Sequence, residues 1–217
     1  MLFAIGFIFT FTHGGLTGLL LGNVVVDLPL SDTFFVVAHF HMVMGVSPVM
    51  VLYAAIYHWF PKITGRLLSH RLGVLHFWGT FLGTYAIYLP MHYLGFLGVP
   101  RRYFAMGDSE FIPDSATSLN EGITIFAIIV ALVQLIFIYN VIKSLISGHK
   151  ASENPWGAAS LEWHTPSTPP EHGNWGTDLP RVYRWAYDYS VPNVKDDFIP
   201  QSTPPNAVVY ASKDKEE

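Results

Sequence analysis

Four long apolar stretches, separated by polar segments, dominate the chain before residue 150. They run over about residues 2–26, 33–60, 72–96 and 122–146. A helix rises about 1.5 Å per residue, so roughly 20 apolar residues cross the hydrocarbon core of a bilayer. Each stretch is long enough for this, and the pattern therefore predicts an all-α membrane protein with four transmembrane helices in residues 1–150.

The rest of the chain, residues 151–217, follows a different pattern. It is rich in proline and alternates aromatic with polar residues, without the periodicity of a helix or a strand ladder. We expect an extended tail on the surface of a larger complex. Its anchors would be tryptophans, namely Trp156, Trp163, Trp175 and Trp185.

The second apolar stretch contains two histidines, His39 and His41, near its beginning. Ionisable residues inside a membrane span are costly, so they are candidates for function. Each helical residue advances about 100°, which turns the two rings about 200° apart. They cannot share one metal ion, but each can bind a separate haem iron, with Phe40 between the two haems. The alternative is that both histidines hydrogen-bond to neighbouring helices.

Other features of the spans have simpler interpretations. Gly14, Gly18 and Gly22 recur at the spacing that lets a neighbouring helix approach closely, which we expect to be their role. His13 interrupts the first span, where either a packing hydrogen bond or a place beside a polar channel explains it. Pro29 is expected to break the helix after the first span, and Pro48 to kink the second.

Composition narrows the classes of function. Of the 217 residues, 51% are hydrophobic and 13% charged, which is unlike an ordinary soluble domain. The chain has no cysteine, which excludes disulfides, covalently attached c-type haem and cysteine-ligated metal centres on these residues. The net charge of -4 and the absence of a basic patch argue against nucleic acid as a partner. Since the chain begins inside an apolar segment without a signal peptide, we expect it to be part of something larger.

Charge also predicts the orientation in the membrane. Four spans place both ends of the chain on one side, where the basic residues Lys62, Arg66, Arg71, Lys143 and Lys150 gather. Basic loops stay on the cytoplasmic side, so the 61–71 loop and the tail are expected inside. The 27–32 turn and the 97–121 loop would then lie outside, close to the two histidines.

Charged residues in the outer loops have two interpretations each. Asp32 is either the N-cap of the second span, which alone suffices to explain it, or a ligand of a hard cation. Arg101 and Arg102 either bind the propionates of a haem next to His39 or His41, or pair with a local acid such as Asp108. The histidines on the same side favour the propionates.

The motifs together resemble subunit I of the haem–copper cytochrome c oxidases. The similarity rests on residues 14–18 (GGLTG), 32–41 (DTFFVVAHFH), 98–103 (GVPRRY), 154–157 (NPWG) and 161–163 (LEW). It extends over nearly the whole chain, which is similar to the last four of that subunit's twelve helices plus its C-terminal tail.

The resemblance implies a role for each candidate residue. His39 would bind the iron of the high-spin haem, where oxygen is reduced, and His41 the iron of the low-spin haem. Arg101 and Arg102 would bind propionates, and Asp27 would lie near those of the high-spin haem. Asp32 would belong to a magnesium site, although Ser31 stands where the family usually has a further magnesium ligand, a histidine.

The resemblance also implies cofactors and partners. We expect two haems of the a type and an active-site copper whose ligands lie on another chain or segment, the one with the first eight helices. Further partners would be oxidase subunits II and III, cytochrome c as electron donor, and the lipid of a bacterial plasma membrane or mitochondrial inner membrane. The alternatives are a quinol oxidase of the same superfamily, a non-catalytic di-haem electron carrier, and a structural or transport module without haem.

Overall fold

The computed structural model describes residues 1–103, 112–165, 169, 174–175, 179–188, 191–194 and 199–208 of the chain. Four helical segments are long and apolar enough to cross a membrane, Leu2–Leu21, Phe34–Thr64, His70–Phe96 and Asp114–Ser147. The described residues form no β-strand. The structure thus confirms the predicted all-α class with four candidate spans.

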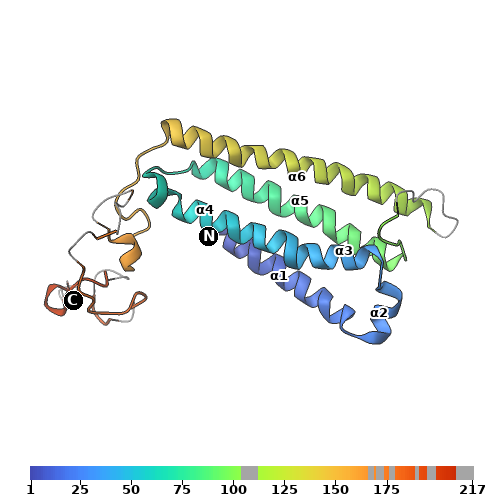
Figure 1. The fold of residues 1–217 in the computed structure, drawn as a ribbon, viewed down its shortest axis with the longest axis horizontal. Coiled ribbons are helices and arrows are strands. Elements are labelled where there is room, and N and C mark those ends of the chain that lie inside the picture. Colours follow the sequence, from blue (N-terminus) through green and yellow to red (C-terminus); the bar gives the residue numbers. More distant parts are fainter. Residues whose placement is uncertain are drawn as a thin grey trace, which may run out of the picture. The chain divides into compact units, whose positions relative to one another are not determined.

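The second span is built from three pieces. It comprises α3 (Phe34–Phe40), the π-helix η1 (His41–Val46) and α4 (Ser47–Thr64). The other spans are the continuous helices α1 (Leu2–Leu21), α5 (His70–Phe96) and α6 (Asp114–Ser147). In Figure 1, α1, α3 and α5 lie side by side, and α6 runs along α5.

The connection after α1 differs from the expected turn. A short helix, α2 (Val24–Leu30), follows almost at once, and the Asn23 side chain caps it by accepting a hydrogen bond from Val25 N at 3.1 Å. Pro29 does not break this helix, contrary to our expectation. It lies in the last turn of α2, where the missing N–H removes one helical hydrogen bond, the one to Val25 O, and the helix ends one residue later.

Glycines allow α5 and α6 to approach closely. A Cβ atom added to Gly79 would lie 2.9 Å from Val133 Cγ1, and one added to Gly83 would collide with the Val130 side chain. Small residues at helix interfaces give the close van der Waals packing that holds membrane helices together. The same packing holds for Gly14 and Gly18 of α1, as their spacing predicts, whereas Gly22 meets carbonyls of its own helix.

Contacts divide the chain into two compact units, Met1–His58 with Ser69–Lys143, and Trp59–Leu68 with Ser144–Glu217. The second unit is held together by a strap between residues 65–67 and 148–151. Within it, Leu67 N donates to His149 O at 2.8 Å, and the Arg66 guanidinium donates to Gly148 O at 2.8 Å. The segment after α6 is thereby tied to the loop after α4.

Within this second unit, aromatic and charged residues of the loop region contact the start of the tail. Trp59 Nε1 donates to the Glu162 carboxylate, and the Lys62 ammonium lies 5.6 Å from the centre of the Trp163 ring. Trp163 is buried, and Trp156 packs edge-on against it. A cation over an indole face is a favourable contact in a partly desolvated setting.

Candidate functional site

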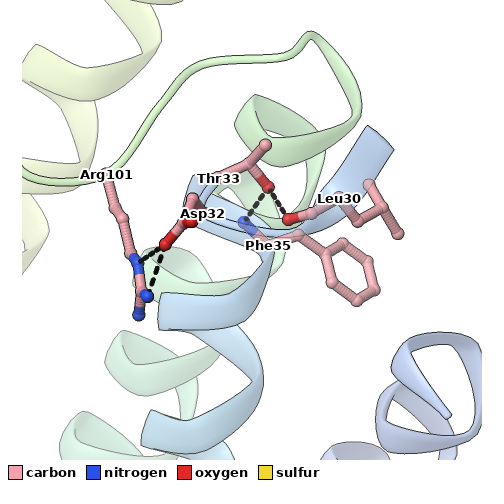
Figure 2. Close-up of polar contacts among 5 residues, drawn as sticks. All are labelled: Leu30, Asp32, Thr33, Phe35 and Arg101. Carbon is pink, nitrogen blue, oxygen red and sulfur yellow. Dashed lines mark hydrogen bonds and ion pairs between the residues drawn. The ribbon is translucent and has the colours of Figure 1, made fainter. Parts of the chain in front are cut away.

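The first turn of α3 is fixed by polar contacts from both sides (Figure 2). Thr33 is the N-cap: its hydroxyl donates to Leu30 O at 2.7 Å and accepts from Phe35 N at 3.2 Å. Of the two interpretations of Asp32, N-cap or ligand of a hard cation, the N-cap is wrong. Asp32 has a left-handed backbone with a φ of 59°, whereas an N-cap residue needs extended backbone, which Thr33 provides.

Asp32 instead holds the loop after α5 against the start of α3. Its Oδ1 accepts from Arg101 Nε at 2.9 Å and Nη2 at 2.5 Å, and its backbone carbonyl accepts from Arg101 N at 2.8 Å (Figure 2). Beside this pair, Phe34 N donates to Val99 O at 3.0 Å. The alternative partner that we considered, Asp108, lies outside the described residues.

Close packing completes the support of α3. A Cβ on Gly95 of α5 would collide with the backbone nitrogen of Phe35, so α3 and α5 touch backbone to backbone at this level. Phe35 itself is buried, with 1% of its surface exposed. The two histidines that follow therefore stand on a helix whose start cannot move freely.

His39 is oriented by α1. Its Nδ1 lies 2.9 Å from Gly14 O and 3.1 Å from the Thr17 hydroxyl. A backbone carbonyl can only accept, so Nδ1 carries the hydrogen and Nε2 keeps a free lone pair. A Cβ on Gly18 would lie 2.9 Å from His39 Cε1, which shows how closely α1 borders the ring.

His41 has the same tautomer through a different partner. Its Nδ1 donates to Val37 O, one turn earlier in the chain, at 2.8 Å. The ring stacks on Tyr88 of α5, with centres 5.3 Å apart and planes 20° apart. Phe40 separates the two histidines in sequence and packs on the His41 ring with centres 4.5 Å apart.

Both histidines therefore present a free Nε2. Neither Nε2 atom is fully buried, so each can be reached by a ligand. Metal-bound histidines almost always donate their other ring nitrogen to a carbonyl or carboxylate, which fixes the tautomer and the ring orientation. This arrangement fits axial ligation of two haem irons, one by each histidine.

The π-helix at His41–Val46 is a feature that sequence reasoning missed. The Ser47 hydroxyl donates to Met42 O at 2.6 Å, a carbonyl five residues back, and lies 3.0 Å from the Thr10 hydroxyl of α1. Pro48 has no N–H for an α-helical bond and was the available signal, although we expected it to produce a kink. Single π-helical turns within α-helices often lie at functional sites.

The remaining candidate residues do not gather into a metal site. The described residues contain no group of three His, Asp or Glu side chains that could hold a metal ion. Asp27 is half-buried in the first turn of α2, Ser31 follows α2, and Asp32 pairs with Arg101. Arg102 is exposed, with a left-handed backbone φ of 70°.

The fold and the histidine pair together define a polytopic helical membrane protein with two candidate axial-ligand positions on one helix. A family model described as cytochrome C and quinol oxidase polypeptide I matches residues 1–136. This chain belongs to that family.

Individual relatives agree with the family. The chain is 66% identical over 205 residues to the alternative cytochrome c oxidase subunit 1 of Bradyrhizobium diazoefficiens, which covers 94% of this chain and 35% of that protein. It is 49% identical over 191 residues to cytochrome c oxidase subunit 1 of Thermostichus vulcanus, covering 88% of this chain and 33% of that protein. The chain thus spans about a third of the length of these curated relatives.

A solved structure shares the fold. It is described as a heme-copper terminal oxidase dimer, and it superimposes with a TM-score of 0.58 at 21% identity, over 68% of this chain and 26% of the other. At this identity the likeness shows the fold alone. The fold of about two thirds of this chain is therefore found in a solved structure.

Proposed function

We propose that this chain is the C-terminal part of the catalytic subunit of a proton-pumping terminal oxidase, which transfers electrons from cytochrome c to oxygen and forms water. One observation carries the proposal: His39 and His41 each donate Nδ1–H to a backbone carbonyl and keep Nε2 free. Membership of the oxidase family supports it. The whole activity needs the other two thirds of the subunit.

The two histidines take different irons in this proposal. From the resemblance to the family, His39 binds the high-spin haem and His41 the low-spin haem, with Phe40 between them. The haems, when bound, supply redox-active iron, and we expect the a type. The chain's own residues orient the ligands: Gly14 O and Val37 O hold the two Nδ1–H groups, which makes each imidazole a stronger donor to iron.

Charged residues at the start of α3 complete the haem environment. We assign Arg101 and Arg102 to the propionates and Asp27 to their neighbourhood. A guanidinium can bind a carboxylate through two of its nitrogens, and Arg101 donates from Nε and Nη2 to a single oxygen of Asp32, Oδ1. The described residues do not form a magnesium site around Asp32, so we derive no step through magnesium.

The other parts of the oxidase would come from partners. The ligands of the active-site copper would lie on the segment with the first eight helices, which completes a twelve-helix core. Subunits II and III, and cytochrome c as electron donor, complete the list of proposed partners. The family description also names quinol oxidases, but the relatives reported above are named cytochrome c oxidase, which favours that donor.

We place the chain in a bacterial plasma membrane or a mitochondrial inner membrane, with residues 151–217 on the cytoplasmic or matrix side. The support is the cluster of Lys62, Arg66 and Lys150 in the second unit, where residues 66 and 150 face each other in an isolated bridge. Basic residues next to transmembrane ends favour the inner side.

An optical spectrum of the purified complex tests the proposal. We expect two haem populations in the reduced-minus-oxidised spectrum, and carbon monoxide should shift one of them. A non-catalytic di-haem carrier would show low-spin haem without a response to carbon monoxide. A complex without haem would overturn both and leave the histidines as buried polar residues of a structural module.

A further inference from the structure

His92 of α5 is a buried histidine that the proposed haem ligation does not use. Its side chain is 6% exposed, and its Nδ1 donates to Tyr88 O, one turn earlier, at 2.7 Å. Nε2 must then be an acceptor, and it is buried without a hydrogen-bond partner in the described chain. A buried polar atom left unpaired costs about 1–3 kcal/mol, so a donor is expected to face it.

Among the aromatic rings that contact His92 in the described part of the chain, one can donate. Of the aromatic rings that contact His92 among the described residues, Phe35 presents carbon and hydrogen alone, with centres 4.9 Å apart. The other ring is His13 of α1, with centres 5.2 Å apart. His13 forms no side-chain hydrogen bond with described residues that would compete, and its other ring contact is with Tyr85 at 5.5 Å.

The distance between the two imidazoles suits a direct bond. A separation of 5.2 Å between centres is that of two rings joined by an N–H···N hydrogen bond of ordinary length. The planes stand 45° apart, and rotation of the His13 ring about its Cβ–Cγ bond exchanges nitrogen and carbon positions. With the His13 ring as it stands, His92 Nε2 has no partner among the described residues, and a flip of that ring would present a nitrogen where a carbon now lies while α1 stays in place.

We propose that His13 donates a hydrogen bond to His92 Nε2, and that this imidazole pair positions the Gly14 carbonyl against His39. The part that concerns His39 rests on the proposed function. Gly14 follows His13 directly and its carbonyl holds His39 Nδ1 at 2.9 Å. His92 is fixed by its own helix, so the pair connects α5, through α1, to the orientation of the iron ligand.

The packing at Gly14 explains why the pair matters. A Cβ atom on Gly14 would lie 3.1 Å from the backbone nitrogen of Val43 in the π-helix, so α1 is already in close contact there. A small displacement of α1 changes the His39 hydrogen bond, which sets the donor strength of the imidazole. His13 and His92 are positioning residues in this scheme, since neither contacts the iron.

The test uses the complete oxidase with His13→Leu, His92→Phe and the double variant. The readouts are the iron–histidine stretching band of the reduced high-spin haem, from resonance Raman spectroscopy, and the haem content. We expect each single variant to shift the band downward, and the double variant to shift it no further, because one bond is lost in all three. His13→Gln keeps an N–H donor and should restore the band.

A matched control is His70→Leu, because His70 is an exposed histidine at the first residue of α5. It should leave the band unchanged. An unchanged band in His13→Leu with full haem content would overturn the inference while leaving the proposed function intact. Loss of the high-spin haem signal from the wild-type complex would instead overturn the proposed function.

A second measurement stands apart from haem. A high-resolution map of the complex should show a nitrogen of His13 within about 3.2 Å of His92 Nε2. A longer separation, or another group bound to Nε2, would overturn the inference even if the variants fail to assemble.

Discussion

His39 at the end of α3 and His41 at the start of η1 are bound differently from His76 of α5, although all three lie in the same helical unit. His76 is 0% exposed, and both of its ring nitrogens are engaged: Nδ1 lies 3.2 Å from the Tyr57 hydroxyl, and Nε2 3.0 Å from Gln134 Oε1. His39 and His41 each use Nδ1 alone. The surroundings, not the residue type, separate a structural histidine from a candidate ligand.

The polar network around His76 has one consistent assignment. Gln134 Nε2 donates to Val130 O at 2.9 Å, which fixes the amide so that Oε1 accepts from Tyr53 at 2.7 Å and from His76 Nε2. His76 Nδ1 therefore accepts from Tyr57. A fully satisfied network of this kind fixes the packing of α4, α5 and α6 and leaves no position open for a ligand.

The largest expected effect comes from removing the Nε2 atoms of His39 and His41 that have no hydrogen-bond partner among the described residues. His39→Asn should remove the high-spin haem, and His41→Asn the low-spin haem, because asparagine offers no imidazole to the iron. The pyridine haemochrome content and the optical spectrum of the complex measure this. His70→Asn, on an exposed position, should retain both haems. Full haem content in His39→Asn would contradict the distinction between His39 as a haem ligand and His76 as a packing residue.

The next largest effect concerns His76, whose two ring nitrogens are both hydrogen-bonded. His76→Leu removes the acceptor of the Tyr57 hydroxyl hydrogen and one of the two donors to Gln134 Oε1, and a lost buried hydrogen bond of this kind costs about 1–3 kcal/mol. We expect a lower thermal midpoint of the complex, followed by haem absorbance, with unchanged haem content before heating. Loss of one haem at room temperature would show that His76 acts beyond packing.

A steric variant sharpens the comparison without removing any polar atom. In Gly18→Ala the new Cβ would lie 2.9 Å from His39 Cε1, and such overpacking costs about 1–3 kcal/mol. We expect a shifted high-spin haem spectrum and an unchanged low-spin one. Gly15→Ala is the matched control, because its Cβ meets no atom within 4 Å. Equal spectra in both variants would mean that α1 does not limit His39.

The smallest effect is expected at the start of α3. The side chain of Asp32 is 76% exposed, and exposed ion pairs contribute about 0–1 kcal/mol, so Asp32→Asn should change the thermal midpoint little. Asparagine also tolerates the left-handed backbone at this position, whereas Asp32→Val does not and should destabilise more. A large effect of Asp32→Asn would indicate a further role for the carboxylate.

The sequence predicted the spans because length and hydrophobicity determine them directly. It also predicted the close packing at Gly14 and Gly18, where spacing along a helix is informative. The end of α1 was not evident, since three valines follow it at residues 24–26 and Asn23 caps a new helix that begins there. Hydrophobicity reports the environment of a segment, and it does not report where the backbone changes direction.

The candidate site was predicted in part. The spacing of His39 and His41 was informative from the chain alone, but their tautomers depend on Gly14 O and Val37 O, whose positions need the fold. Asp32 and Thr33 are both good capping residues, and the choice between them depends on the backbone that the Arg101 contact imposes. The His92 pairing joins two helices far apart in sequence, so no local pattern indicates it.

The strap between residues 65–67 and 148–151 has a consequence for biosynthesis. Arg66 and its acceptor Gly148 are 82 residues apart, and α5 and α6 are both made between them. During synthesis, the loop after α4 therefore lacks its partners at residues 148–151 until α5 and α6 have been made. Closure of this end is therefore a late step in the maturation of the chain, and a ribosome stalled before residue 148 would leave residues 65–67 without these partners.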